Sequence, residues 1–461
     1  MPSGTRCTFK PMPDNPLYLG LDLGTTSAKI CAFDATGRLI RERSGDYELL
    51  HPEPGAAVQD VRAIAEVAER ILAEILADLP GPPAGLGISC PMHGVLLLDA
   101  AGEPTGPVIT WADVRAQAVM DRFDASQRKK LLHRTGTPVH PMSPLVKLRW
   151  LTASHPDRLA GATRLGDLKS YLVDRWTIDG PLIDEQLASA TGLLNLETRD
   201  WDKAALKLAG NGQALPLELP RVVPANHRLQ WRPEVARQLG TSDVPLFIGG
   251  SDGCLANLGS GLLEPGKISL TIGTSGAVRA THRGLSGTTD HQLFNYLLYD
   301  DYYVLGGATN NGGKVLEWTY ELLCGHFSGI GPMIEAAAAA PDTNLVFRPY
   351  LNGERAPVWD ALATAAFVGL RGSHTPTDLA RAVLLGVTDN IIAILRQVEA
   401  ATCPAEVIYA SGGFTRSEAW VKLMAERCGR RVEIAQTPQA SAYGAARIAE
   451  KALARPSSAQ Q

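Results

Sequence analysis

The stretch Leu19-Gly-Leu-Asp-Leu-Gly-Thr-Thr-Ser27 joins two short apolar segments, residues 17–23 and 27–34. The first segment is typical of a buried strand, and the second of its hairpin partner. The Asp-Ala-Thr-Gly sequence at 34–37 supplies turn residues before a further strand at 38–43. The chain is therefore predicted to begin with three consecutive strands.

A long helix is expected after these strands. Asp60 is suited to cap its N-terminus, and apolar residues keep a helical spacing as far as Leu79. The Pro-Gly-Pro-Pro sequence at 80–83 ends the helix, and residues 85–90 return as a strand. The order β-β-β-α-β is the signature of a sheet in which an antiparallel hairpin lies beside parallel strands, so we predict an α/β fold.

The second half of the chain repeats this plan. Strands are expected at 267–272 and 277–281, on either side of a turn at 273–276. The remaining elements predicted for this half are strands at 302–305, 407–411 and 432–435 and helices at 313–323, 377–401, 417–427 and 441–453. The similarity between the halves is one of architecture rather than of sequence.

The length of 461 residues is enough for two or three domains. We expect a loose N-terminal tail at 1–16, an N-terminal domain at 17–247 and a C-terminal domain at 248–455. The boundary is placed between the proline-containing segment 224–245 and Gly249.

Composition and charge exclude several classes of partner. Apolar residues make up 45% of the chain, charged residues 20%, and the net charge is −4, so no basic stripe is available for nucleic acid or acidic membranes. The 7 cysteines are scattered without a C-x-x-C pair, which is typical of reduced thiols in the cytosol. No run approaches the ~20 apolar residues that span a bilayer. The sequence predicts a cytoplasmic protein.

The sequence Asp22-Leu-Gly-Thr-Thr-Ser27 has the residues of a phosphate-binding turn. Glycine lets the backbone approach an anion, and hydroxyl and backbone N–H groups bind phosphate oxygens. Asp22, at the strand end, can orient hydrated Mg²⁺, and Lys29 can face the same oxygens. A plain β-hairpin is the alternative. A second turn of similar composition, Gly273-Thr-Ser-Gly276, favours the phosphate interpretation.

Asp252 lies in the sequence Gly249-Gly-Ser-Asp-Gly-Cys254, directly after the apolar run 244–248. Small neighbours leave space around its carboxylate, and a general base in phosphoryl transfer needs such space to reach a substrate hydroxyl. The alternative is an aspartate that caps a helix. That role does not account for the small residues on both sides, so we favour the base.

These residues resemble those of the FGGY family of carbohydrate kinases. The resemblance follows the family order and covers nearly the whole chain from Leu17 to Ala449. The matching pieces are the turn at 22–26, Met92-His-Gly94, Trp111-Ala-Asp-Val-Arg115, Asp252-Gly253, Gly273-Thr-Ser-Gly276, Pro349-Tyr-Leu-Asn-Gly-Glu-Arg-Ala-Pro357 and Ser411-Gly-Gly-Phe-Thr-Arg-Ser417. Each piece alone is weak, but together they are a strong signal.

The resemblance implies an α/β protein with two actin-like (ribonuclease H-like) ATPase domains flanking a central cleft. It implies an ATP-dependent carbohydrate kinase in which Asp252 is the general base and Asp22 helps to place Mg²⁺. The residues expected to bind ATP are Gly24, Thr25, Thr26, Lys29, Gly273, Thr274, Asn311, Gly312, Gly313, Gly412 and Gly413.

A sugar pocket is expected where the family places it, at Met92, His93, Trp111 and Asp113, with Arg115 beside them. Thioether and aromatic faces pack on C–H surfaces, and polar groups pair with hydroxyls. The alternative for Met92 and Trp111 is a place in the core. Asp113 and Arg115 put charge beside the tryptophan, which favours the pocket.

Three segments, 133–147, 167–171 and 189–202, are similar to the gluconokinase branch of the family. Because gluconate carries a carboxylate, its pocket should contain a cation. The candidates by position are Lys169, Arg134 and His140, although arginine and lysine usually lie on solvated faces.

The expected reaction is phosphorylation of D-gluconate to 6-phosphogluconate. The alternatives are a xylulokinase, another FGGY polyol or ketose kinase, or a non-catalytic actin-like ATP-binding switch. Dimers are common in such families, so a homodimer is possible.

Overall fold

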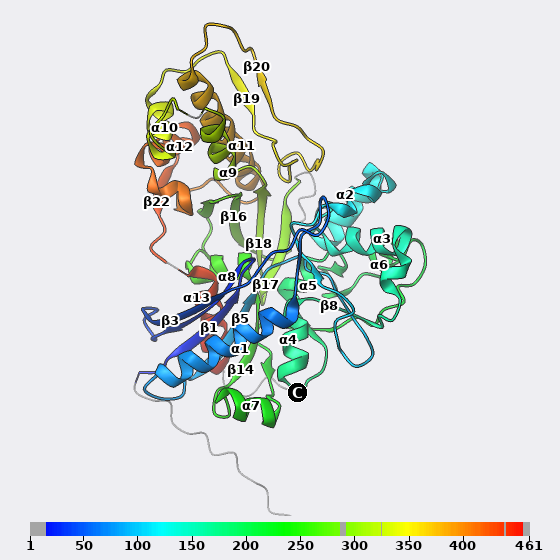
Figure 1. Ribbon diagram of the computed structural model, residues 1–461. Helices are drawn as coiled ribbons and strands as arrows, with labels where there is room; N and C mark the ends of the chain where they lie inside the picture. Colours follow the sequence, from blue (N-terminus) through cyan, green and yellow to red (C-terminus); the bar gives the residue numbers. More distant parts are fainter. Residues whose placement is uncertain (1–14, 286–291, 324, 438, 455–461) are drawn as a thin grey trace, which may run out of the picture.

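The computed structural model describes residues 15–285, 292–323, 325–437 and 439–454. Of the predicted N-terminal tail, residues 1–14 lie outside this range, as does the last residue of the predicted C-terminal domain. The chain forms two large α/β units, with a smaller group of helices beside the first (Figure 1).

The first unit is built on a six-stranded sheet of order β13-β14-β5-β1-β2-β3. The pairs β1–β2 and β2–β3 are antiparallel, whereas β1–β5 and β5–β14 are parallel. This confirms the predicted hairpin beside parallel strands. The bounds are β1 Tyr18–Leu23, β2 Ser27–Phe33, β3 Leu39–Asp46, β5 Gly85–Cys90, β13 Arg228–Leu229 and β14 Leu246–Ser251.

The second unit repeats the arrangement in a sheet of order β17-β18-β16-β15-β21-β22. Here β15–β16 and β16–β18 are antiparallel, and β15–β21 and β21–β22 are parallel. The repeated architecture predicted for the two halves is therefore present. The bounds are β15 Lys267–Ile272, β16 Gly276–Arg283, β17 Phe294–Tyr299, β18 Tyr302–Thr309, β21 Val407–Ser411 and β22 Arg431–Ile434.

Helices cover both sheets. The Asp60 side chain caps α1 by accepting a hydrogen bond from the Arg62 N–H, as predicted, and α1 packs its apolar side on the first sheet. In the second unit, the Thr375 side chain caps the long helix α11. The helices of this framework are α1 Val61–Asp78, α7 Pro233–Leu239, α8 Asp252–Gly259, α9 Gly313–Leu322, α10 Ile330–Ala339, α11 Pro376–Ala401, α12 Glu418–Cys428 and α13 Ala440–Ala454.

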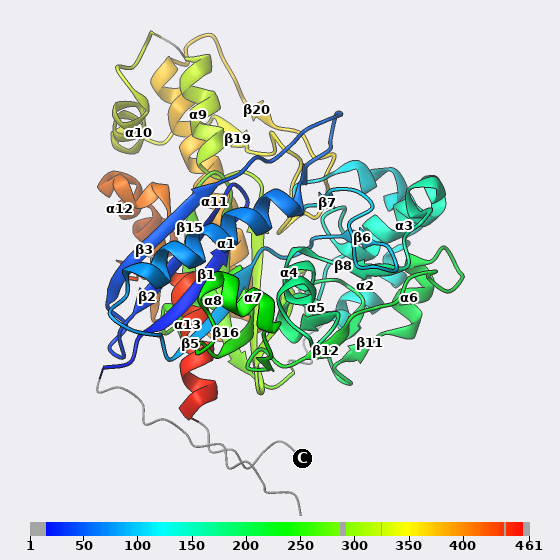
Figure 2. The same ribbon diagram turned by 60° about the horizontal axis from the view of Figure 1, so that its bottom comes forward.

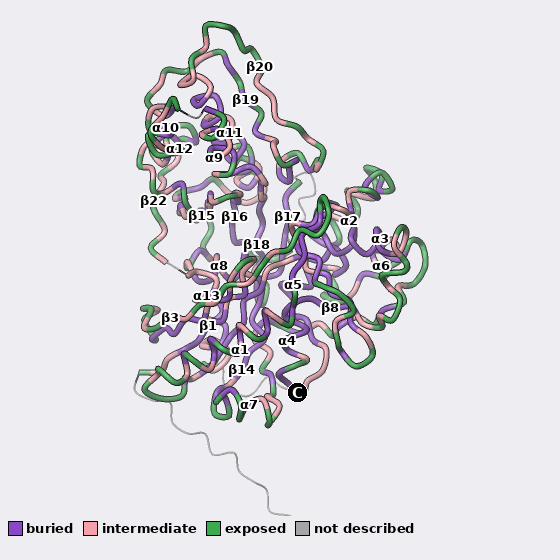
Figure 3. Tube along the Cα trace, in the orientation of Figure 1, coloured by how far each residue is buried: buried purple, intermediate pink, exposed green. Residues whose placement is uncertain are grey.

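A separate apolar cluster holds together part of the segment inserted between β5 and β13, whereas residues 168–188 of this segment contribute to the core of the first unit. Figure 3 shows purple, buried chain inside this group of helices as well as in the two sheets. Its main elements are β6 Leu96–Leu98, β8 Arg164–Gly166, β9 Leu182–Asp184, α2 Ala125–Thr135, α3 Pro144–Ser154, α4 Leu168–Trp176, α5 Glu185–Ser189 and α6 Lys203–Ala209.

The last helix, α13, returns to the first unit and packs against β1, β5 and α8 (Figure 2). Glycines allow this close approach, because a Cβ atom at Gly20 would lie 1.8 Å from the Ala442 carbonyl oxygen. A Cβ at Gly444 would lie 2.0 Å from the Leu255 carbonyl oxygen. Residues on both sides of the expected boundary at 247 thus belong to one packed unit, since β14 also continues to Ser251 in the first sheet.

Candidate active site

Asp252 is the first residue of α8, where β14 passes directly into the helix. The helix is capped by Ser251, whose Oγ accepts a hydrogen bond from the Cys254 N–H at 3.4 Å. Ser251 therefore fills the capping role that was the alternative for Asp252. The Asp252 Oδ1 atom accepts a hydrogen bond from the Gly253 N–H at 2.6 Å. A carboxylate in the first turn is also favoured by the helix dipole.

Buried polar side chains hydrogen-bond to the backbone at the junction of β14 and α8, which is called the elbow below. Gln186 Oε1 accepts a hydrogen bond from the Ser251 N–H at 2.9 Å. The fully buried Lys169 ammonium donates to Asp184 Oδ2 and to the Gly250 carbonyl oxygen, both at 2.7 Å. The direction of Asp252 is thus determined by contacts on the residues directly before it.

Asp252 lines a cavity of about 260 Å³ between the two units. The cavity brings together predicted residues from distant parts of the chain. They are Thr25, Met92, His93, Trp111, Asp252 and Gly273. Residues predicted for the phosphate side and residues predicted for the sugar side therefore meet around one carboxylate.

The pKa of Asp252 is raised to about 6, mainly by burial and also by the nearby Asp22 carboxylate, while Arg279 acts in the opposite direction. Burial also raises the pKa of Asp22, although Ser89 Oγ donates a hydrogen bond to Asp22 Oδ1 at 2.6 Å. Two carboxylates thus repel each other at the end of β1 and the start of α8. A general base with a pKa near 6 is ionised at neutral pH and still basic enough to accept a proton.

The Asp22 carboxylate fits a hydrated magnesium ion. Mg²⁺ is usually held by one or two carboxylates together with waters and substrate phosphates. Within the described ranges, no group of three or more His, Cys, Asp or Glu side chains could enclose a metal. The donor set therefore suits an ion that is shared with a phosphate substrate.

The second predicted phosphate turn, residues 273–276, lies against the start of α9. The Gly313 N–H donates to the Gly273 carbonyl oxygen at 2.6 Å, and the Lys314 N–H donates to the Thr274 carbonyl oxygen at 3.3 Å. A Cβ at Gly312 would lie 2.5 Å from the Ser275 carbonyl oxygen, so only glycine fits. These hydrogen bonds hold the turn in place on the N-terminus of α9.

The first turn is linked to the sugar side of the cavity. Trp111 Nε1 donates to Thr25 Oγ1 at 3.2 Å, and Gln59 donates to the Thr25 carbonyl oxygen at 2.7 Å. Tyr47 donates to the Gly24 carbonyl oxygen at 2.7 Å, and its backbone N–H donates to the Thr26 carbonyl oxygen at 3.0 Å. The backbone of this turn is therefore held from two sides.

The pair Gly412-Gly413 follows β21. Gly412 has φ +91°, and a Cβ there would lie 2.4 Å from the Ile272 carbonyl oxygen, so both conformation and space require glycine. A Cβ at Gly413 would meet nothing within 4 Å. The backbone of Gly413 is therefore open to its surroundings, and its contact with a nucleotide stays a prediction.

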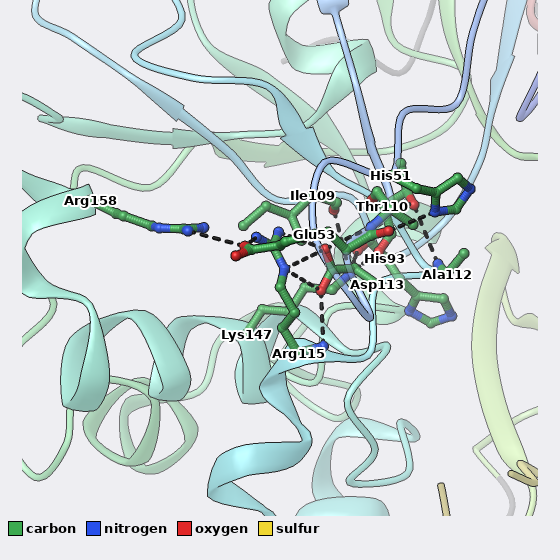
Figure 4. A network of polar contacts seen from close by, with 12 residues as sticks. His51, Glu53, His93, Ile109, Thr110, Ala112, Asp113, Arg115, Lys147 and Arg158 are labelled. Atoms are coloured by element: carbon green, nitrogen blue, oxygen red, sulfur yellow. Dashed lines mark hydrogen bonds and ion pairs between the residues drawn. The ribbon is translucent and has the colours of Figure 1, made fainter.

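Asp113 and Arg115 point toward each other (Figure 4), and neither residue lines the cavity. Arg115 Nη2 lies 2.6 Å from Asp113 Oδ2, and the Ala57 N–H donates to the same oxygen at 3.0 Å. Arg115 also pairs with Glu53 and lines a different cavity. The physical reason is that a fully buried carboxylate needs a close cation, and the nearest one in sequence provides it.

The three cations suggested for a substrate carboxylate lie elsewhere. Lys169 is already paired with Asp184, and Arg134 pairs with Asp202. The His140 ring packs on Trp359 with centroids 5.7 Å apart, and burial lowers its pKa to about 3, so it is neutral. None of these three side chains lines the cavity.

Two predicted ATP contacts have partners within the protein. Lys29 Nζ lies 3.3 Å from Gln439 Oε1, just before α13. The Asn311 amide donates to the Gly353 carbonyl oxygen at 2.8 Å and to Glu354 at 3.2 Å. The Asn311 side chain therefore holds the loop at 349–357 in place.

Several cavity residues were not predicted from the sequence. They are Met142, Arg279, Phe294, Tyr296, Arg355 and Trp359. Arg355 lies inside the motif at 349–357, and Arg279 lies on the strand that leaves the second phosphate turn. The only sequence signal that could have placed these two arginines in the site was their position in or near a recognised motif.

Lys147, on α3, is a further buried residue that organises the site. Its ammonium donates to the carbonyl oxygens of His93 and Thr110, both at 2.6 Å, and lies 3.4 Å from that of Ile109 (Figure 4). One side chain thus joins the loop that carries Met92 and His93 to the loop that leads into Trp111.

Two α/β units share a five-stranded order, β3-β2-β1-β5-β14 in the first and β18-β16-β15-β21-β22 in the second, and meet at one cavity. This arrangement defines an actin-like (ribonuclease H-like) ATPase fold. The chain belongs to the FGGY family of carbohydrate kinases. The N-terminal domain model of that family matches residues 17–259, and the C-terminal domain model matches residues 268–453.

The chain is similar to gluconokinases and to xylulose kinases. It is 35% identical to the gluconokinase of Bacillus subtilis (strain 168), over 93% of this chain and 86% of that protein. It is 28% identical to a xylulose kinase of Staphylococcus epidermidis, over 95% and 88% of the two chains. The crystal structure of a gluconate kinase from Lactobacillus acidophilus superposes with a TM-score of 0.87 and 30% identity, over 95% of this chain and 90% of that chain.

The chain is a carbohydrate kinase by this membership. Across the described part of the chain, no helix combines the length and apolar character needed to cross a membrane.

Proposed function

We propose that this protein transfers the γ-phosphoryl group of ATP to the C6 hydroxyl of D-gluconate, with Asp252 as the general base. The observation that carries the proposal is the place of the Asp252 carboxylate. It lies in one cavity with Thr25 and Gly273 of the two phosphate turns and with Met92 and Trp111 of the sugar side. A base must lie between donor phosphate and acceptor hydroxyl in this way.

In the proposed reaction, Asp252 accepts the proton of the C6 hydroxyl while the bond between O6 and the γ-phosphorus forms. The bond between that phosphorus and the bridging oxygen of ADP breaks, and ADP leaves. Backbone N–H groups of the turn at 273–276 and the hydroxyl of Thr25 stabilise charge on the transferred group. Asp22 would help to hold Mg²⁺, which when bound offsets phosphate charge.

Gluconate is favoured over other sugars because curated relatives at 34–35% identity are gluconokinases. The second candidate is xylulose, because xylulose kinases are 28% identical and one from Lactobacillus acidophilus superposes with a TM-score of 0.86. A substrate screen with coupled ADP detection separates the two. A preference for xylulose over gluconate would assign the protein to xylulose, and ATP turnover indifferent to any sugar would indicate a nucleotide switch.

The base is tested with Asp252→Asn. This change removes the proton acceptor but keeps the shape of the side chain, so kcat should fall by at least ~10²-fold while ATP binding is nearly retained. Asp78→Asn, at an exposed ion pair with Arg43, is the matched control and should leave kcat unchanged. Near-normal turnover by Asp252→Asn would contradict the assignment of the base.

A further inference from the structure

Two guanidinium groups share the cavity with Asp252. Arg279 comes from β16, and Arg355 comes from the loop at 349–357. In both, the Nε atom is buried and has no hydrogen-bond partner among the described residues. A buried donor without a partner costs free energy, and two in one cavity indicate a missing acceptor.

Of the two guanidinium groups, that of Arg279 has fewer polar partners to offset its charge. Within the described ranges its side chain forms no hydrogen bond, and no carboxylate lies within 4 Å of its nitrogens. Its place is defined by Gly253, because a Cβ there would lie 3.3 Å from Arg279 Nε and 2.8 Å from Met92 Cε. The guanidinium therefore lies beside the residue that follows Asp252 and next to the sugar side of the cavity.

The Arg355 guanidinium has contacts on two sides, but its Nε–H remains without an acceptor among the described residues. Its Nη2 donates to the Thr309 carbonyl oxygen at 3.1 Å, and its Cζ lies 5.3 Å from the centre of the Trp111 ring. The pKa of Arg355 is lowered to about 10, mainly by burial and also by Arg279, while Glu354 acts in the opposite direction. The two positive charges are thus close enough to repel each other, and an anion between them would relieve this repulsion.

The position of Arg279 along β16 distinguishes this anion from the phosphates of the nucleotide. Arg279 lies three residues beyond Gly276, which is about 10 Å along a strand. Alternate residues of the strand, Ala277 and Arg279, line the cavity, whereas Val278 packs in the core. An anion at Arg279 is therefore deeper in the sugar side than one held by the turn.

We propose that Arg279, assisted by Arg355, binds the carboxylate of a sugar acid and so selects aldonates over neutral polyols. This inference rests on the proposed function, in which the far end of the same substrate presents its C6 hydroxyl to Asp252. An arginine fork suits the task because its planar donors match both oxygens of a carboxylate.

The test compares gluconate with D-glucitol, which has the same carbon chain but a CH₂OH group in place of the carboxylate. Binding is measured by calorimetry, and KM by coupled ADP detection. Wild-type protein should bind gluconate more tightly than glucitol, and Arg279→Gln should weaken gluconate by about 10- to 100-fold while affecting glucitol much less. Arg279→Lys, which keeps the charge but not the fork, should give an intermediate loss.

Arg283→Gln is the matched control, because Arg283 lies on the same strand but is exposed and pairs with Asp301 at 3.2 Å. It should leave the gluconate-to-glucitol ratio at the wild-type value. Melting temperature and the KM for ATP report whether each variant is folded.

Three outcomes would overturn the inference. An unchanged gluconate-to-glucitol ratio in both folded Arg279 variants would remove Arg279 as the carboxylate contact. A higher KM for ATP with that ratio unchanged would assign the guanidinium to a nucleotide phosphate. A wild-type protein that phosphorylates another sugar and shows no preference for gluconate over glucitol would refute the proposed function and the carboxylate contact together.

Discussion

Replacing Lys147 by Met tests whether one buried ammonium holds the sugar side of the cavity together. Methionine fills similar space but donates no hydrogen bond, so the carbonyl oxygens of His93 and Thr110 each lose a donor at 2.6 Å. Unsatisfied buried carbonyls are costly, but the variant avoids the cost of burying a charge, so we expect a net loss of about 2–4 kcal/mol in the free energy of unfolding.

The Lys147→Met variant should also show a specific pattern of KM values. Because Lys147 joins the loops that carry His93 and Trp111, the KM for the sugar substrate should rise more than the KM for ATP. The assays are thermal melting and initial rates with each substrate varied. Lys422→Met, at an exposed ion pair with Glu426, is the control and should leave both unchanged.

Stability should also depend on pH through this group. Burial lowers the pKa of Lys147 to about 7, with Asp113 acting in the opposite direction and Arg115 in the same direction. In the unfolded chain the lysine pKa is about 10.4, so between these values the unfolded state binds more protons than the folded state. This contribution to stability is complete above about pH 10 and is lost as pH falls to about 7. Lys147→Met should lose that slope, and a variant with wild-type melting, KM and slope would refute the reasoning.

The other predictions concern the elbow that carries Asp252. Since the pKa of Asp252 is raised to about 6, kcat/KM should fall as pH decreases through 6, approaching about tenfold per pH unit, and a profile flat down to pH 5 would contradict its role as a base. Lys169→Met should cost about 3–5 kcal/mol, because it leaves the Asp184 carboxylate buried without its cation. Unfolding of the double variant Lys169→Met, Asp184→Asn checks this, because asparagine carries no charge but can still cap α5, so stability should be partly restored; a double variant less stable than the single one would argue against the pairing.

The elements with clear local boundaries could be predicted from the sequence. The strand Gly85–Cys90 follows a proline-rich stop, and Val407–Ser411 ends at Gly412, so both were predicted with their observed bounds. The strand β17 was not predicted. Its residues 294–299 are largely apolar without alternation, and such a run does not distinguish a buried strand from a helix.

The residues of the candidate site were likewise predictable only where the signal is local in the sequence. The glycine turns and the setting of Asp252 are local, and the structure brings them together at one cavity. The partners of buried charges are not local. Nothing near Lys169 in sequence shows that Asp184 will neutralise it, and Arg279 faces the cavity only because β16 pairs with β15 and β18. Contacts between distant parts of the chain therefore determine which cationic side chains remain free to face the cavity.

The return of α13 to the first unit has a consequence for biosynthesis. One side of β1 and β5 is covered by α13, which is synthesised after the second unit, and at Gly20 and Gly87 the fit is so close that a Cβ would lie 1.8 and 2.2 Å from a carbonyl oxygen of that helix. During translation this side of the sheet stays bare while the whole second unit is made. The first sheet therefore reaches its full packing only after the second unit has been made, and until then it exposes apolar surface of the kind that makes folding intermediates prone to aggregation.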